Sequence, residues 1–169
     1  MTLIRHNVRL MTNVEDFLKA NGIDYVQHEH VAVFTAEDLG KHCSHVPGLH
    51  CKNLFLRNQK YKRYFLVVLH ATHTTDLKKV SEVVGEKKLS FANPETLREK
   101  LGVEVGSVSP FGLLNDTLHE VEVYIDQVVY DADIVSFHPN RNTASLELSG
   151  AMFRKFLELM KQKIEVVNL

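Results

Sequence analysis

The sequence contains no tryptophan, only two cysteines and almost no net charge. Two cysteines, Cys43 and Cys51, are too few for a disulfide framework and are typical of a reducing compartment, so we expect a cytoplasmic protein. A formal net charge of −1 excludes a chain that binds long nucleic acid over its whole surface, and any such contact needs a local basic face. No apolar run approaches the about 20 residues of a membrane span, so no membrane partner is expected.

The motifs of several cofactor and metal sites are also absent. The sequence has no Gly-x-Gly-x-x-Gly after a strand pattern, no phosphate-binding loop, no Cys-x-x-Cys and no His-Glu-x-x-His. Ten histidines are present, with close pairs in the ranges 28–30, 42–45 and 70–73. Surface or locally hydrogen-bonded histidines are the more common interpretation of such pairs. We therefore expect neither a metal nor a cofactor.

The length and the order of the patterns predict the fold class. A chain of 169 residues is long enough for one domain with a sizeable core, and two full domains would be cramped. Helical and strand patterns are mixed, and several strand patterns are joined by short turns, which favours antiparallel pairing. We predict an α+β fold with a central mixed, largely antiparallel sheet flanked by helices. Residues 1–12 are expected to form a tail, and residues 13–165 the domain.

Capping residues and apolar periodicity predict the individual elements. Helices are expected at 14–20, from Thr35 to near Gly40, at 75–84, at 95–101 and from 149 onward. Strands are expected at 23–28, 54–56, 64–69, 103–109, 121–125, 128–130, 134–137 and 144–148. Residues 111–117 are predicted to form a loop.

A lysine and an asparagine, Lys52 and Asn53, stand at the start of an apolar strand. A lysine beside buried strand residues must extend its ammonium to water or meet an anionic or carbonyl oxygen. Taken alone, extension to water is the more common outcome. Cys51 precedes this lysine, and a nearby cation lowers a thiol pKa. Strand alternation, however, places the Cys51 side chain on the opposite face, which favours a packing cysteine over a nucleophile.

Two loops carry residues that suit a binding site. In the stretch Gly106–Pro110, the glycine permits close approach of the backbone and the proline stiffens the turn, so the peptide groups between them can act as fixed donors and acceptors. In the stretch 138–143, His138 can donate or accept a hydrogen bond near neutral pH, and Asn142 begins the next strand. An ordinary structural turn is the alternative for both loops.

Together, residues 28–38, the Lys52-Asn53 pair, the Gly106–Pro110 loop and residues 138–143 resemble a known family. The resemblance is to the stand-alone aminoacyl-tRNA deacylases of the YbaK/ProX family, related to the bacterial prolyl-tRNA synthetase editing domain, and within it to the eukaryotic alanyl-tRNA(Pro) branch. It covers about residues 14–161. It implies a metal-free hydrolase that acts in translation fidelity by cleaving the ester between a wrong amino acid and the terminal ribose of tRNA.

The resemblance also implies roles for individual residues. The implied catalytic residues are Lys52, Gly106 and His138. The implied substrate-binding residues are Asn53, Ser107, Val108, Ser109, Pro110, Thr35 and Asn142. A local basic rim for the tRNA would consist of Arg57, Lys60, Lys62, Arg63 and Arg141, although a solvated hairpin tip is an equal alternative. The expected partners are the acceptor end of a mischarged tRNA and a prolyl-tRNA synthetase or multi-synthetase assembly, and the chain is expected to be a monomer or weak dimer.

The expected chemistry is water-mediated. An aminoacyl ester is activated, so its hydrolysis needs a positioned water and a stabilised oxyanion more than a covalent nucleophile. A small pocket would admit alanine and exclude proline by steric clash. Candidate pocket walls are Val33, Phe34, Leu49, Leu69 and Phe111, for each of which core packing is the more common role. Two alternatives stay open: a deacylase for cysteinyl- or another small aminoacyl-tRNA, and a non-catalytic module that binds a tRNA end or a synthetase.

Overall fold

The computed structural model describes residues 12–169, so nearly all of the expected tail lies outside the described residues. The helices are α1 (Val14–Ala20), α2 (Ala36–His42), α3 (Leu77–Val84), α4 (Pro94–Leu101), the 3₁₀ helix η1 (Pro110–Asn115), α5 (Gln127–Tyr130) and α6 (Gly150–Leu159). The strands are β1 (Val26–Glu29), β2 (Leu49–Asn58), β3 (Tyr64–His70), β4 (Leu89–Phe91), β5 (Val121–Asp126), β6 (Ile134–Phe137), β7 (Ala144–Ser149) and β8 (Ile164–Val167). None of the helices within residues 12–169 combines the length and apolar character needed to cross a membrane.

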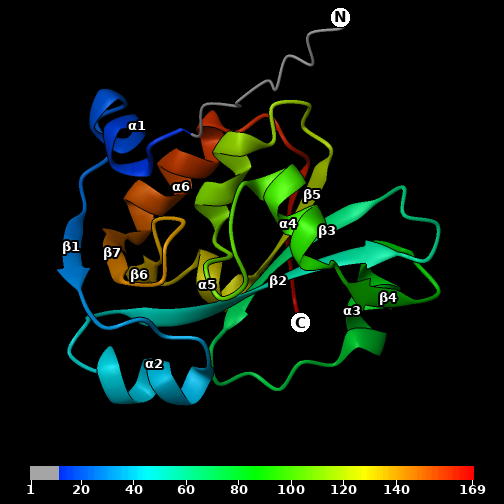
Figure 1. Ribbon diagram of the computed structural model, residues 1–169, viewed down its shortest axis with the longest axis horizontal. Coiled ribbons are helices and arrows are strands. Elements are labelled where there is room, and N and C mark those ends of the chain that lie inside the picture. Colours follow the sequence, from blue (N-terminus) through cyan, green and yellow to red (C-terminus); the bar gives the residue numbers. More distant parts are fainter. Residues whose placement is uncertain (1–11) are drawn as a thin grey trace, which may run out of the picture.

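The eight strands form one mixed sheet. Its order is β1-β7-β6-β2-β3-β5-β8, with β4 paired to β2. The antiparallel pairs are β1–β7, β6–β7, β2–β3 and β2–β4, and the parallel pairs are β2–β6, β3–β5 and β5–β8. Helices α1, α4 and α6 lie on one side of the long β2–β3 hairpin, and α2 and α3 lie on the other (Figure 1). The predicted α+β fold with a mixed sheet is confirmed.

Strand β3 separates two apolar clusters because its side chains alternate between the two faces of the sheet. Leu66 and Val68 belong to the larger cluster, which contains side chains of α1, α4, η1 and α6. Phe65, Val67 and Leu69 belong to a second cluster with α3. Burial on both faces explains why residues 64–69 form a continuous apolar run, which made the strand predictable.

Three predicted elements differ in the structure. The expected strand at 103–109 is an irregular segment, because the left-handed conformation of Gly106 (φ +87°) interrupts an extended run. The expected loop at 111–117 begins as the helix η1, whose N-cap Ser109 accepts a hydrogen bond of 3.1 Å from the Phe111 N–H through Oγ. The apolar triplet at 128–130, interpreted as a strand, lies in the short helix α5. Val129 of this helix is buried in the larger apolar cluster, so core packing explains the apolar residues.

Two strands were not predicted. The three-residue strand β4 is too short to show an apolar alternation, and β8 is a half-buried edge strand whose apolar residues give only a weak pattern. Strand β8 pairs with β5 up to Val167, so the sheet continues past residue 165, where the domain was expected to end.

Candidate active site

A single cavity of about 180 Å³ brings together segments that are distant in the sequence. It is lined by Val33, Phe34, Thr35, Leu39, Cys51, Lys52, Asn53, Ala71, Gly106, Val108 and His138. These residues come from the β1–α2 connection, α2, β2, the end of β3, the segment before η1 and the end of β6. Cavities for drug-sized ligands are usually about 300–1,000 Å³, so this one suits a small group such as an aminoacyl moiety.

The cavity lies where one edge of strand β2 lacks a strand partner. That edge pairs with β6 only at Leu49 and His50, and with β4 only at Leu56–Asn58. In the described part of the chain, residues 52–54 between them take part in strand pairing only with β3, on the other edge. This stretch holds Lys52 and Asn53, which line the cavity together with Gly106 and Val108. The interruption of the ladder therefore leaves room for a ligand beside the strand.

Hydrogen bonds tie the three loops around the cavity to each other. Asn142 Nδ2 donates to the Val33 carbonyl over 3.1 Å, and the Val33 N–H donates to the Asn142 carbonyl over 3.2 Å. Ser109 Oγ donates to Asn140 Oδ1 over 3.3 Å, which joins the segment before η1 to the loop after β6. Asn142 and Ser109 thus stabilise the loops around the cavity but do not line it.

Lys52 lies in β2, directly opposite Leu69 of β3. Its Nζ donates to the carbonyl of His73 in the β3–α3 connection. An ammonium has three donors, so two remain for a ligand. Burial lowers the pKa of the Lys52 ammonium, because the charged form loses part of its hydration. Lys52 therefore supplies a partly desolvated positive charge at the cavity.

Asn53 contributes a buried acceptor. Its Oδ1 is inaccessible to solvent and has no hydrogen-bond partner in the described structure. An unsatisfied buried polar atom costs about 1–3 kcal/mol, so such an atom is unusual and points to a functional constraint. Asn53 lies on the same face of β2 as Phe55, whereas Lys52 lies on the face of Leu54 and Leu56.

His138 follows strand β6, and its tautomer is set by a backbone contact. Its Nδ1 donates to the Ala144 carbonyl over 2.8 Å, which leaves Nε2 of the neutral ring as an acceptor. Burial lowers the pKa of His138, the bond to the Ala144 carbonyl opposes this, and the neighbouring His30 and His50 lower the pKa further. The His138 and His30 ring centroids are 5.6 Å apart. His138 is therefore an uncharged acceptor at neutral pH.

Cys51 does not have the properties of a nucleophile. Burial raises the pKa of its thiol strongly, because an apolar environment disfavours the thiolate. Its Sγ lies 3.6 Å from the Leu49 carbonyl, and the side chain packs against the larger cluster. This agrees with the interpretation as a packing cysteine.

Six of the ten predicted catalytic and substrate-binding residues line the cavity, and the other four do not. Those that line it are Lys52, Asn53, Thr35, Gly106, Val108 and His138. Those that do not are Ser107, Ser109, Pro110 and Asn142, of which the first three are buried. Of the candidate walls, Val33 and Phe34 line the cavity, whereas Leu49, Leu69 and Phe111 belong to the apolar clusters.

None of the residues of the expected basic rim lines the cavity. Arg57 lies five residues beyond Lys52 along β2, about 17 Å at the usual rise per residue, so the hairpin with Lys60, Lys62 and Arg63 is at the far end of the strand. Arg57 covers the ring of Tyr61 at 3.6 Å. Arg141 lies near the site but forms ion pairs with Glu15 (2.6 Å) and Glu29 (3.6 Å).

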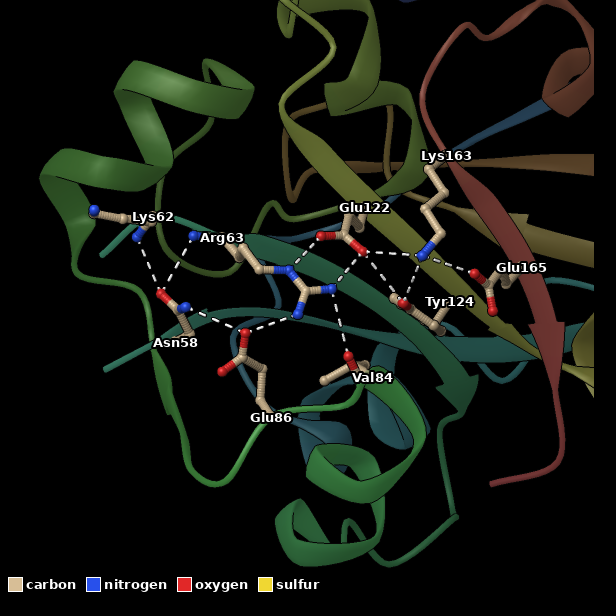
Figure 2. A network of polar contacts seen from close by, with 9 residues as sticks. All are labelled: Asn58, Lys62, Arg63, Val84, Glu86, Glu122, Tyr124, Lys163 and Glu165. Atoms are coloured by element: carbon tan, nitrogen blue, oxygen red, sulfur yellow. Dashed lines mark hydrogen bonds and ion pairs between the residues drawn. The ribbon is translucent and has the colours of Figure 1, made fainter. Parts of the chain in front are cut away.

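Arg63 is committed to an internal network (Figure 2). It donates to both carboxylate oxygens of Glu122, over 2.7 and 2.8 Å, and to Glu86 over 2.7 Å. Asn58 and Lys163 extend the network through these two carboxylates. The guanidinium thus joins the hairpin to β5 and to the α3–β4 connection, and its hydrogen bonds are made within the protein.

Sequence reasoning missed Leu39 and Ala71 as lining residues. Leu39 also packs against the small cluster of Val33, Cys43 and Val46, so its apolar character indicated only a core role. Ala71 carries no chemical signal at all. No group of three or more histidine, cysteine or acidic side chains in the described part of the chain is arranged to hold a metal ion.

Two half-buried histidines, His50 and His138, predict how the free energy of unfolding depends on pH. The pKa values of His138 and His50 are lowered by burial, so the unfolded chain takes up protons first as the pH falls below about 6.5. The free energy of unfolding should therefore decrease from pH 7.5 to 5.5. In His138→Asn, which keeps a donor for the Ala144 carbonyl, we expect a smaller decrease. Urea unfolding at pH 7.5 and 5.5 measures the decrease in the free energy of unfolding. If the decrease were as large in His138→Asn as in the wild type, His138 would not contribute to it.

The chain is similar to known proteins over most of its length. A model of the aminoacyl-tRNA editing domain matches residues 30–156. Prolyl-tRNA editing protein ProX of Acetoanaerobium sticklandii is 36% identical over 147 residues, which cover 87% of this chain and 90% of that protein. Prolyl-tRNA synthetase associated domain-containing protein 1 of Danio rerio is 35% identical over 153 residues, which cover 89% of this chain and 83% of that protein.

The solved structures show the same fold. A crystal structure described as a candidate trans-editing enzyme for prolyl tRNA synthetase superposes with a TM-score of 0.68 at 20% identity, covering 95% of this chain and 99% of that one. The hypothetical protein APE2540 gives a TM-score of 0.69 at 20% identity, covering 90% of this chain and 97% of that one. The resemblance and the aminoacyl-tRNA deacylase class predicted from sequence are confirmed. Because the match to the aminoacyl-tRNA editing domain covers most of the chain, this protein is a member of the aminoacyl-tRNA editing domain family.

Proposed function

We propose that this protein is a trans-editing deacylase that hydrolyses alanyl-tRNA(Pro). The observation that carries the proposal is the small cavity that combines Lys52, Asn53 and His138 with the backbone around Gly106. It is supported by membership of the editing family and by relatives named for prolyl-tRNA editing or prolyl-tRNA synthetase association. The proposal includes a cytoplasmic location and a prolyl-tRNA synthetase as the enzyme whose errors are corrected.

In the proposed reaction, water adds to the ester carbonyl of the aminoacyl group. The Lys52 ammonium stabilises the negative charge that develops on the carbonyl oxygen. The bond between the carbonyl carbon and the ribose oxygen then breaks, and a proton from the attacking water passes to that oxygen. The products are the free amino acid and tRNA. Peptide groups near Gly106 and a hydroxyl of the terminal ribose orient the water, and the neutral His138 accepts a hydrogen bond from the substrate.

Substrate selection follows from the size of the cavity. A volume of about 180 Å³ has to hold the aminoacyl group and the attacking water. Attraction distinguishes small apolar side chains poorly, while a steric clash distinguishes them well. The side chains of Val33, Leu39 and Val108 form apolar parts of the lining. We propose that these walls admit the methyl group of alanine and exclude the ring of proline.

The test is release of amino acid from a panel of tRNA(Pro) charged with alanine, proline, cysteine or serine, with a metal chelator present. We expect fast release of alanine alone. Release of cysteine or serine instead would keep the deacylase and change its substrate. No release from any member of the panel would contradict the enzymatic role and favour a module that binds a tRNA end or a synthetase.

A further inference from the structure

The mouth of the cavity carries an aromatic ring that the proposed reaction does not use. Phe34 lines the cavity, yet 67% of its surface is exposed. Two more exposed apolar residues lie close in sequence to residues that line the cavity: Val31 (60%), three residues before Phe34, and Val105 (57%), next to Gly106. Single exposed apolar residues are common on proteins. An exposed aromatic ring that also lines a candidate active site instead indicates a contact surface.

Phe34 is held in place by its surroundings. The preceding Val33 is buried and is bonded to Asn142 through both its N–H and its carbonyl. The Phe34 N–H donates to Asp38 Oδ2 over 3.2 Å. A Cβ atom at Gly106 would lie 3.2 Å from Cδ1 of Phe34, so the glycine allows the loop to approach the ring closely. One edge of the ring therefore contacts the loop, and the rest is presented to solvent.

The size of the cavity decides what this ring can meet. The proposed substrate carries its amino acid on the ribose of the terminal nucleotide, and that nucleotide has a base. A cavity of about 180 Å³ that is occupied by the aminoacyl group has no room for a purine as well. The base must therefore lie outside, next to the mouth. The basic side chains of the hairpin are too far away to hold this nucleotide through its phosphate, and Arg141 is already paired.

We propose that Phe34 is the stacking platform for the adenine base of the 3′-terminal nucleotide of tRNA. This inference rests on the proposed function. Aromatic side chains bind single-stranded nucleic acid ends by stacking, which adds affinity without requiring a particular base. The platform would hold the terminal nucleotide while Lys52 acts on the ester, so Phe34 is a substrate-binding residue and not a catalytic one.

The kinetic test compares two substrates and three variants. For alanyl-tRNA(Pro), Phe34→Leu should raise KM about tenfold or more with little change in kcat, and Phe34→Trp should keep KM near the wild-type value. For the alanyl ester of ribose 5-phosphate, which keeps the ribose hydroxyl used in the proposed reaction and lacks only the base, neither variant should change kcat/KM. Phe91→Leu is the matched control, because Phe91 is also largely exposed (57%) and lies on β4, away from the cavity.

A binding test is independent of turnover. The protein has no tryptophan, so Phe34→Trp carries the sole indole. AMP should quench its fluorescence, ribose 5-phosphate should not, and Phe91→Trp should respond to neither.

The outcomes separate the platform from the proposed function. If Phe34→Leu lost the same factor in kcat/KM on both substrates, Phe34 would be a wall of the amino-acid pocket, and the platform would be overturned. Equal KM values of Phe34→Leu and Phe34→Trp for alanyl-tRNA(Pro) would also overturn the platform. If the wild type hydrolyses neither substrate, the proposed function fails. The fluorescence titration then decides alone: quenching by AMP supports the platform, and its absence overturns it.

Discussion

Replacement of Lys52 by methionine should lower kcat for alanyl-tRNA(Pro) by about 100-fold or more, with KM little changed. Lys52 provides the partly desolvated ammonium of the cavity, and removal of one donor to a developing oxyanion costs about 10²–10³ in kcat. Methionine keeps an unbranched apolar stem in β2 and removes only the charge. Because kcat rather than KM carries the loss, the result identifies an interaction made in the transition state.

The measurement is single-turnover release of alanine, with two controls. Lys87→Met removes an exposed lysine in the α3–β4 connection and should leave the rate at the wild-type value. Urea unfolding should show that Lys52→Met is folded, with a free energy of unfolding within about 1 kcal/mol of the wild type. A rate within fivefold of the wild type in Lys52→Met would exclude lysine as the group that stabilises the oxyanion.

Replacement of Arg63 by methionine should lower the free energy of unfolding by about 2 kcal/mol, since it leaves two carboxylates without their main partner. The side chains of Glu86 and Glu122 are only 20% and 19% exposed. For a domain of this size the melting temperature should fall by about 4–8 °C. Arg63→Lys should recover only part of the loss, because an ammonium cannot bind Glu122 through two parallel hydrogen bonds.

The neighbouring lysine provides the matched control for this stability prediction. Lys62 is exposed, and its main-chain N–H rather than its ammonium bonds to Asn58. Lys62→Met should therefore change the free energy of unfolding by less than about 0.5 kcal/mol. At a temperature where all variants are folded, Arg63→Met should keep the wild-type rate of deacylation, because Arg63 follows the Asn58 end of β2, away from Lys52. If Arg63→Met kept the wild-type free energy of unfolding but had a lower rate of deacylation, Arg63 would be a substrate-binding residue instead.

Local chemistry determined a large part of the fold. Thr35 and Asp38 form the capping box that their spacing predicted, and Asn93 with Pro94 starts α4. The apolar runs of β2 and β3 also lie where predicted, because burial on both faces leaves a strong pattern. These features depend on residues within a few positions of each other, so they can be read from the chain alone.

The family resemblance determined the chemical identity of the site. The resemblance implies Lys52, Asn53, Gly106 and His138 as site residues, and all four line one cavity. Composition alone would not have selected them, because a lysine or histidine near a strand is usually an ordinary surface or core residue. Their order along the chain supplied that information.

Only the tertiary structure decided which charged and aromatic residues are available to a ligand. Arg63 finds its carboxylates 23 and 59 residues away, and Arg141 finds Glu15 126 residues away, so neither pairing leaves a local signal. The exposure of Phe34 depends in the same way on the packing of Val33 and on the close approach of Gly106. Burial and pairing are properties of contacts between distant segments, and these contacts exist only once the sheet has brought the segments together.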